Sequence, residues 1–154
     1  MSEVHPDVLG AIASLQRLAE LFSERRRQLA RDAGLTETQW RVLEEAEGED
    51  FMPSMFARRR ACTPAAVSRT LRQLLDRDLV RASIGASDGR QRVYRLTAKG
   101  RRTLAGLHQK RARAIESIWQ DLPRQELRAF TRFASDLAER LETYVASGAS
   151  RGRV

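Results

Sequence analysis

Residues 63–100 read TPAAVSRTLRQLLDRDLVRASIGASDGRQRVYRLTAKG, and this stretch decides how the chain folds. Thr63 and Pro64 are typical of a helix start, because a threonine hydroxyl caps a free amide and proline fits the first helical position. The predicted helix covers residues 64–77 and buries Val67, Leu71 and Leu74. Its exposed side carries small residues and then arginines, which suits close approach to another molecule: Ala65, Ala66, Ser68, Arg69 and Arg72.

Two extended segments follow this helix. Residues 79–84 can form a strand, and in residues 92–96 Tyr94 and Leu96 alternate with Val93 and Arg95. The polar, glycine-containing residues 85–90 lie between them, so we predict a hairpin with a long tip. Thr97 is then expected to cap a new helix that ends near residue 121.

The segment before residue 63 predicts three more helices. The first covers residues 6–31, and its apolar residues recur at spacings of three and four. Thr36 and Gln39 have the spacing of a capping box, which predicts a second helix that ends at Gly48. A third, shorter helix is expected over residues 53–60, followed by a tight connection at residues 61–62.

The last predicted helix begins after Pro123 and carries an apolar seam. Leu127, Phe130, Ala134, Leu137, Leu141 and Tyr144 recur at spacings of three and four. Such a seam needs an apolar partner along its length, from the same chain or from a second copy. Residues 148–154 lack an apolar period, and we expect them to be a disordered tail.

Basic residues are concentrated in the middle of the chain. The formal net charge is +8, but residues 58–102 alone carry thirteen Lys and Arg against three acidic residues. A polyanion is therefore the implied partner. The single cysteine, Cys62, and the lack of a long apolar run predict a soluble cytoplasmic protein without a membrane role.

Two short helices, a tight turn and a hairpin form the outline of a winged helix-turn-helix. The second helix of such a pair fits the major groove, and the hairpin reaches the narrower minor groove, which attracts arginine. The basic block coincides with these elements. We therefore predict a mainly α fold with a small β-hairpin wing that binds double-stranded DNA.

The sequence resembles the MarR family of regulators over about residues 7–146. The resemblance rests on a succession of short motifs: Val67-Ser68-Arg69 through Leu74, Leu79-Val80-Arg81, Asp88-Gly89-Arg90 and Leu96-Thr97-Ala98-Lys99-Gly100. It implies a homodimer that binds a pseudo-palindromic operator, usually as a repressor, and that a small aromatic or phenolic compound can release. Residues 1–34 and 98–147 would form the dimerisation domain, and residues 35–97 the DNA-binding domain.

The DNA-binding candidates come from the predicted helix start, its exposed face and the wing. They are Thr63, Ala65, Ser68, Arg69, Arg72, Asp88, Arg90 and Arg92. The resemblance assigns Arg90 to the wing, with Asp88 orienting its guanidinium. The competing interpretations are an ordinary solvated helix face and a simple turn with a local ion pair.

Trp40, Arg41 and His108 are the candidates for binding an effector. In similar regulators of aromatic acids, an arginine at the position of Arg41 can meet the ligand carboxylate, and such a pair is bidentate. The alternative is that Trp40 belongs to the core and that Arg41 is solvated or paired with a glutamate. For His108 we favour the alternative that it is a surface or interface residue.

Two further positions carry structural expectations. The family commonly has glycine just after the recognition helix, where this chain has Asp78. Aspartate does visit the left-handed conformation, so the fold is not affected. Cys62 stands at a helix start, which lowers a thiol pKa, but it also fills a place for a small apolar residue. We favour packing over redox chemistry.

Other functional classes are weakly supported. No nucleophile–base pair, phosphate loop or paired carboxylates indicate an enzyme, and we predict no cofactor. Two histidines and one cysteine are too few for a conventional zinc site. The alternative function is an architectural protein that binds DNA or RNA through the same basic surface without sequence preference.

Overall fold

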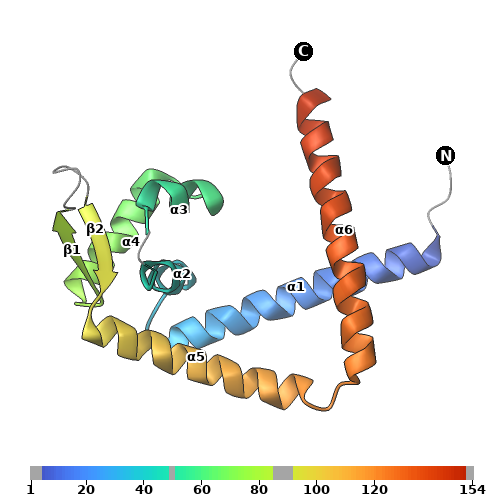
Figure 1. The fold of residues 1–154 in the computed structure, drawn as a ribbon, viewed down its shortest axis with the longest axis horizontal. Helices are drawn as coiled ribbons and strands as arrows, with labels where there is room; N and C mark the ends of the chain where they lie inside the picture. The colour runs from blue at the N-terminus through green and yellow to red at the C-terminus, as the bar shows by residue number, and fades with distance from the viewer. Residues whose placement is uncertain (1–4, 49–50, 85–91, 152–154) are drawn as a thin grey trace. The chain divides into compact units, whose positions relative to one another are not determined.

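The computed structural model describes residues 5–48, 51–84 and 92–151. Within them the chain forms helices and one two-stranded sheet (Figure 1). The elements, in order, are α1 (Pro6–Asp32), α2 (Glu37–Ala46), α3 (Pro53–Arg59), α4 (Pro64–Asp76), β1 (Val80–Ile84), β2 (Arg92–Leu96), α5 (Ala98–Trp119) and α6 (Arg124–Arg151). This confirms the predicted fold class and places most element boundaries within two residues of the prediction.

The connection between α1 and α2 is built from local hydrogen bonds. Gly34 has a φ of 66°, and the amides of Gly34 and Leu35 donate to the carbonyls of Arg31 and Ala30. These two bonds form a Schellman motif, which satisfies the last carbonyls of the helix. The predicted capping box follows, because Thr36 Oγ1 accepts from the amide of Gln39 at 3.1 Å and Gln39 Oε1 accepts from the amide of Thr36 at 3.0 Å.

The turn between α3 and α4 uses the same motif without glycine. Ala61 has a φ of 50°, and the amide of Cys62 donates to the carbonyl of Ala57 at 2.9 Å. Thr63 Oγ1 then accepts from the amide of Ala66 at 3.1 Å, and Pro64 occupies the first position of α4. The predicted cap is therefore confirmed. The tight connection predicted at residues 61–62 is made by an alanine in the left-handed conformation.

Asp78 follows the end of α4 and has the left-handed conformation, which aspartate can adopt. Its φ is 55°, and the amides of Asp78 and Leu79 donate to the carbonyls of Leu75 and Leu74. The chain then enters the antiparallel hairpin, in which Val80 pairs with Leu96 and Ile84 pairs with Arg92. Figure 1 shows the hairpin beside α4. In β2 both Val93 and Tyr94 are half-buried, so the predicted alternation is weaker than expected.

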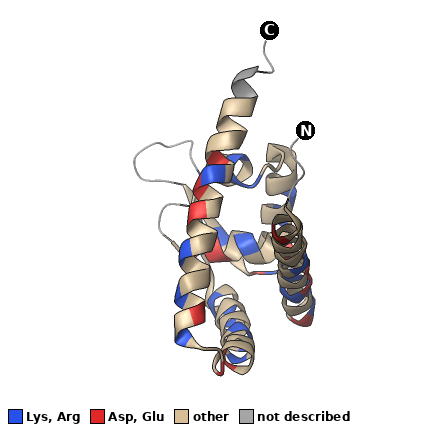
Figure 2. Cartoon of the chain, turned by 90° about the vertical axis from the view of Figure 1, so that its right-hand side faces the viewer, with Lys and Arg blue, Asp and Glu red and all other residues tan. Residues whose placement is uncertain are grey.

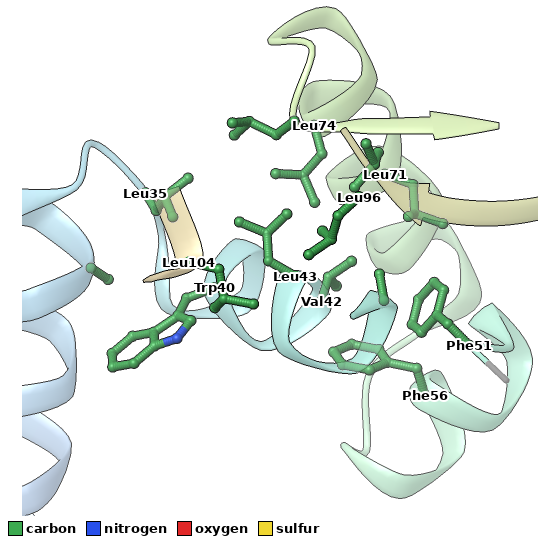
Figure 3. Packing of buried hydrophobic residues seen from close by; sticks show 14 of the residues in the cluster. Leu35, Trp40, Val42, Leu43, Phe51, Phe56, Leu71, Leu74, Leu96 and Leu104 are labelled. Atoms are coloured by element: carbon green, nitrogen blue, oxygen red, sulfur yellow. The ribbon is translucent and has the colours of Figure 1, made fainter. Parts of the chain in front are cut away.

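The chain divides into two compact units, residues 1–112 and 113–154. The hydrophobic core lies in the first unit and is shared by the end of α1, α2, α3, α4, the hairpin and the start of α5. Trp40, Leu43 and Phe56 are among its most deeply buried side chains (Figure 3). The predicted division into a dimerisation domain and a DNA-binding domain stays a prediction.

One expectation about the C-terminus is wrong. Residues 148–151, which we expected to be disordered, continue α6 as far as Arg151. A single glycine, Gly148, costs a helix only about 1 kcal/mol relative to alanine, and its neighbours include the strong helix former alanine. Helical hydrogen bonds along a long helix therefore continue through it. The rest of the predicted tail, residues 152–154, lies outside the described residues.

In the described ranges, no helix is both long enough and apolar enough to cross a membrane.

Candidate nucleic-acid interface

Helix α4 separates its buried and exposed residues clearly. Val67, Leu71 and Leu74 are buried in the core. Ala65, Ser68, Arg69 and Arg72 are exposed on the other side, as the sequence predicts. Thr63 is exposed as well, but its side-chain oxygen is used by the cap of α4. The exposed face of α4 thus carries small residues near its N-terminus and basic residues farther along.

A groove lies between α4 and β2. It has a volume of about 320 Å³ and brings together three predicted DNA-binding residues, Ser68, Arg72 and Arg92. Leu71, Leu75 and Tyr94 complete its lining. Two guanidinium groups from separate elements therefore face one groove, which suits the binding of an anionic group such as a phosphate.

The guanidinium groups on this face are not neutralised by the described part of the chain. Within residues 5–48, 51–84 and 92–151, Arg69, Arg72 and Arg92 form no ion pair with a carboxylate. On α6, by contrast, residues of both signs are interspersed (Figure 2). The surface formed by α4 and β2 therefore keeps its positive charge available to an external anion.

The two wing candidates at the hairpin tip, Asp88 and Arg90, lie outside the described residues. Their assignment stays a prediction. The strands beside the tip are described, and Arg92 at the start of β2 is exposed.

Other members of the basic block have structural roles that sequence reasoning missed. Arg77 Nη1 donates to the carbonyl of Gly34 at 2.8 Å, and Lys99 Nζ donates to the carbonyl of Arg77 at 2.8 Å. Arg59 and Arg60 both pair with Glu45. Nothing in the order of residues distinguishes these cations from those of the exposed face, because their partners are distant in sequence.

The three effector candidates do not share one environment. Trp40 is 1% exposed, and its indole is directed toward α1 (Figure 3). Arg41 pairs with Glu37 at 2.6 Å, and His108 Nε2 lies 3.5 Å from Glu44 Oε1. The alternative interpretation of the sequence, a core tryptophan and an arginine paired with a glutamate, describes these positions.

Trp40 nevertheless carries an unusual feature. Its Nε1–H is buried and has no hydrogen-bond partner among the described residues. The guanidinium carbon of Arg26 lies 5.6 Å from the centroid of the ring. A buried donor without a partner costs about 1–3 kcal/mol, so it is a notable exception in a packed core.

Cys62 is half-buried and packs against the core, and its Sγ lies 3.4 Å from the carbonyl oxygen of Arg60. These contacts agree with a packing role. Among the described residues, no group of three or more His, Cys, Asp or Glu side chains is arranged to hold a metal ion.

Solved structures of MarR-type regulators have this architecture. AbsC of Streptomyces coelicolor, a MarR family transcriptional regulator, is 18% identical with a TM-score of 0.74, over 93% of this chain and 99% of that chain. MarR of Staphylococcus aureus, solved with salicylate and kanamycin, is 16% identical with a TM-score of 0.74, over 88% of this chain and 93% of that chain. The chain has the MarR fold.

A mutant of MepR from S. aureus, solved bound to an oligodeoxyribonucleotide, also has the MarR fold. It is 16% identical with a TM-score of 0.61, over 85% of this chain and 97% of that chain. No family model and no curated protein matches the sequence. At these identities the MarR fold is what the chain shares with the solved structures.

Proposed function

We propose that this protein is a transcriptional regulator that binds DNA through α4 and the hairpin. The observation that carries the proposal is the basic face formed by Arg69, Arg72 and Arg92 around the α4–β2 groove, with which no described carboxylate pairs. The second helix of a helix-turn-helix enters the major groove, where base edges present distinct donors and acceptors. The oligodeoxyribonucleotide bound to the MepR mutant supports this use of the fold.

The roles of the arginines follow from their positions. Arg69 stands on the exposed face of α4, where a guanidinium can bond a guanine edge or a phosphate. Arg72 and Arg92 line one groove, which favours a backbone phosphate. Phosphate contacts set the orientation of a protein on the duplex, and base contacts set its sequence preference. Arg90 and Asp88 extend this surface along the wing in the proposal.

The proposed active form is a homodimer. Within residues 124–148, no side chain of α6 is buried, and this includes large apolar ones. Phe133 is 57% exposed and Leu141 is 56% exposed. On α1, Val8, Ile12 and Leu21 are also exposed. Exposed apolar side chains in this number are typical of a surface that binds another protein chain. A two-fold dimer places two copies of α4 about 34–36 Å apart on one face of the duplex, so the operator is pseudo-palindromic.

The proposed outcome is cytoplasmic repression, relieved by a small aromatic ligand. MarR of S. aureus was solved with salicylate, which is an aromatic acid. In this chain the Nε1–H of Trp40, which has no hydrogen-bond partner among the described residues, is a donor that an incoming acceptor could satisfy. A ligand releases DNA only if it binds one arrangement of the two DNA-binding lobes more tightly than the other.

Selection of bound duplexes from a random pool, followed by sequencing, tests the proposal. We expect enrichment of a near-palindrome with half-sites about one helical turn apart. Arg69→Ala should weaken the operator complex, whereas Arg102→Ala, on an exposed arginine of α5 outside this face, should change it little. Tight, salt-sensitive binding without enrichment would instead indicate the architectural alternative.

A further inference from the structure

A second basic cluster lies at the base of the hairpin. Arg81 of β1 and Arg95 of β2 are direct cross-strand partners, and both are exposed. Arg101, in the first turn of α5, lies beside them, and its Nη1 donates to the carbonyl of Leu96 at 3.0 Å. Together with Ala46 and Glu47 at the end of α2, these residues line a pocket of about 100 Å³.

This pocket is separate from the α4–β2 groove. Successive side chains of a strand point to opposite faces, so Arg95 points away from the face that carries Tyr94 and Arg92. Tyr94 and Arg92 line the groove, whereas Arg95 and Arg81 line the pocket. A DNA duplex seated on α4 therefore does not by itself explain these arginines.

The charge of the pocket is unbalanced. Like charges directly opposite each other on two strands destabilise a sheet. None of the three arginines forms an ion pair with a carboxylate among residues 5–48, 51–84 and 92–151. Glu47 is the one acidic residue of the lining. Three guanidiniums and a single carboxylate therefore line the pocket, and this excess of positive charge suits an anion.

We propose that this pocket binds a phosphate-class oxyanion. Arginine presents paired N–H donors that match two oxygens of a phosphate, and three such groups can surround a tetrahedral anion. The volume is below the roughly 300 Å³ of ordinary small-molecule sites, which favours a single phosphate group over a drug-sized ligand. The phosphate belongs to a free anion or to a nucleic-acid backbone, and the proposal needs no DNA for its first test.

The first test is a calorimetric titration of the whole protein with inorganic phosphate and, separately, with pyrophosphate. The buffer contains chloride and is kept at constant ionic strength. The wild type should bind, and Arg81→Gln with Arg95→Gln should raise the Kd at least tenfold. Arg102→Gln, a neighbouring α5 arginine outside the pocket lining, is the charge-matched control and should bind like the wild type. Measurable phosphate binding of equal affinity in the wild type and the double variant would overturn the site.

Thermal unfolding supplies an independent readout. Without phosphate, Arg95→Gln should melt at or above the Tm of the wild type, because it removes the repulsion with Arg81. With phosphate, the wild-type Tm should rise and that of the double variant should not. A Tm increase of the same size in both proteins would be a general effect of phosphate on protein stability and would contradict the proposal.

Measurements of DNA binding distinguish a free phosphate from a phosphate of the nucleic-acid backbone. If free phosphate does not bind but the double variant reduces the salt slope by about 0.9 for each arginine, the site takes a backbone phosphate. If the slope is unchanged and free phosphate binds, the site takes a free anion. Absence of both effects would refute the proposal, and that result would leave the DNA-binding role of α4 untouched.

Discussion

The backbone carbonyl of Leu79 lies against the α-carbon of Gly100, in the space that a β-carbon on residue 100 would occupy. The contact joins the start of the hairpin to the first turn of α5. Thr97 secures the same junction, because its Oγ1 donates to the carbonyl of Asp78 at 2.7 Å and accepts from the amide of Gly100 at 2.9 Å. The orientation of the hairpin on the core therefore depends on a residue without a side chain.

We expect Gly100→Ala to lower the free energy of unfolding by about 3 kcal/mol or more, because the added methyl meets rigid backbone in a packed core. Gly106→Ala is the control. It stands on the same helix with open space around it and should stabilise by about 0.5–1 kcal/mol. Denaturant unfolding followed by circular dichroism compares the two. Equal midpoints for Gly100→Ala and the wild type would disprove the close contact.

Ala61 is strained by its φ of 50° in the turn before α4. An L-residue pays roughly 1–2 kcal/mol for this conformation, and glycine does not. Ala61→Gly should therefore raise stability by about 1 kcal/mol. Ala105→Gly, within α5, should have the opposite sign, since glycine weakens a helix interior by about 0.5–1 kcal/mol. Destabilisation by both substitutions would mean that residue 61 is not left-handed.

Arg72 and Arg92 should act on DNA as a coupled pair, since they line one groove. Each single alanine variant should reduce operator affinity, and the double variant should lose less than the sum of the two losses. Fluorescence anisotropy over a range of salt concentrations measures both the affinity and the slope. Fully additive losses would show that the two side chains contact separate phosphates.

The pKa of the Glu24 carboxyl group should lie below its ordinary value. Hydrogen bonds from Arg27, and then from Arg31, lower its pKa from the ordinary value of 4.5. The native state thus favours the ionised form. Any stabilisation is complete above the unfolded-state pKa and disappears as the pH falls through the lower folded-state pKa. Carbon-detected NMR titration should find the low pKa, and Arg27→Gln should raise it toward 4.5. An unchanged pKa in that variant would argue against the hydrogen bond.

Dimerisation should depend on the exposed apolar residues of α6. Leu141→Glu introduces a charge at one of these residues and should shift sedimentation equilibrium toward monomer. Ser135→Glu, at an exposed polar position of the same helix, should leave the dimer intact. A monomeric wild-type protein, or equal dimer stability in both variants, would rule out α6 as the interface.

The local elements could be predicted from residues that are close together in the chain. Two helix starts, at Thr36 with Gln39 and at Thr63 with Pro64, follow from caps between near neighbours in the chain. Periodic apolar residues likewise identified the buried side of α4, since a helix of known period fixes which residues share a face. The end of α6 was misjudged, because a weak breaker inside a long helix is outweighed by its neighbours.

Which of the cations lack a partner could not be predicted, because it depends on how the chain is folded. The basic block reads as one charged segment, yet Arg77 and Lys99 bond backbone carbonyls, Arg59 and Arg60 pair with Glu45, and Arg72 and Arg92 meet at a groove. The burial of Trp40 Nε1, without a partner in the described part of the chain, is equally a property of packing. These facts depend on groups that are distant along the chain and adjacent in space. A charge therefore acquires its role from its folded surroundings, which local patterns do not contain.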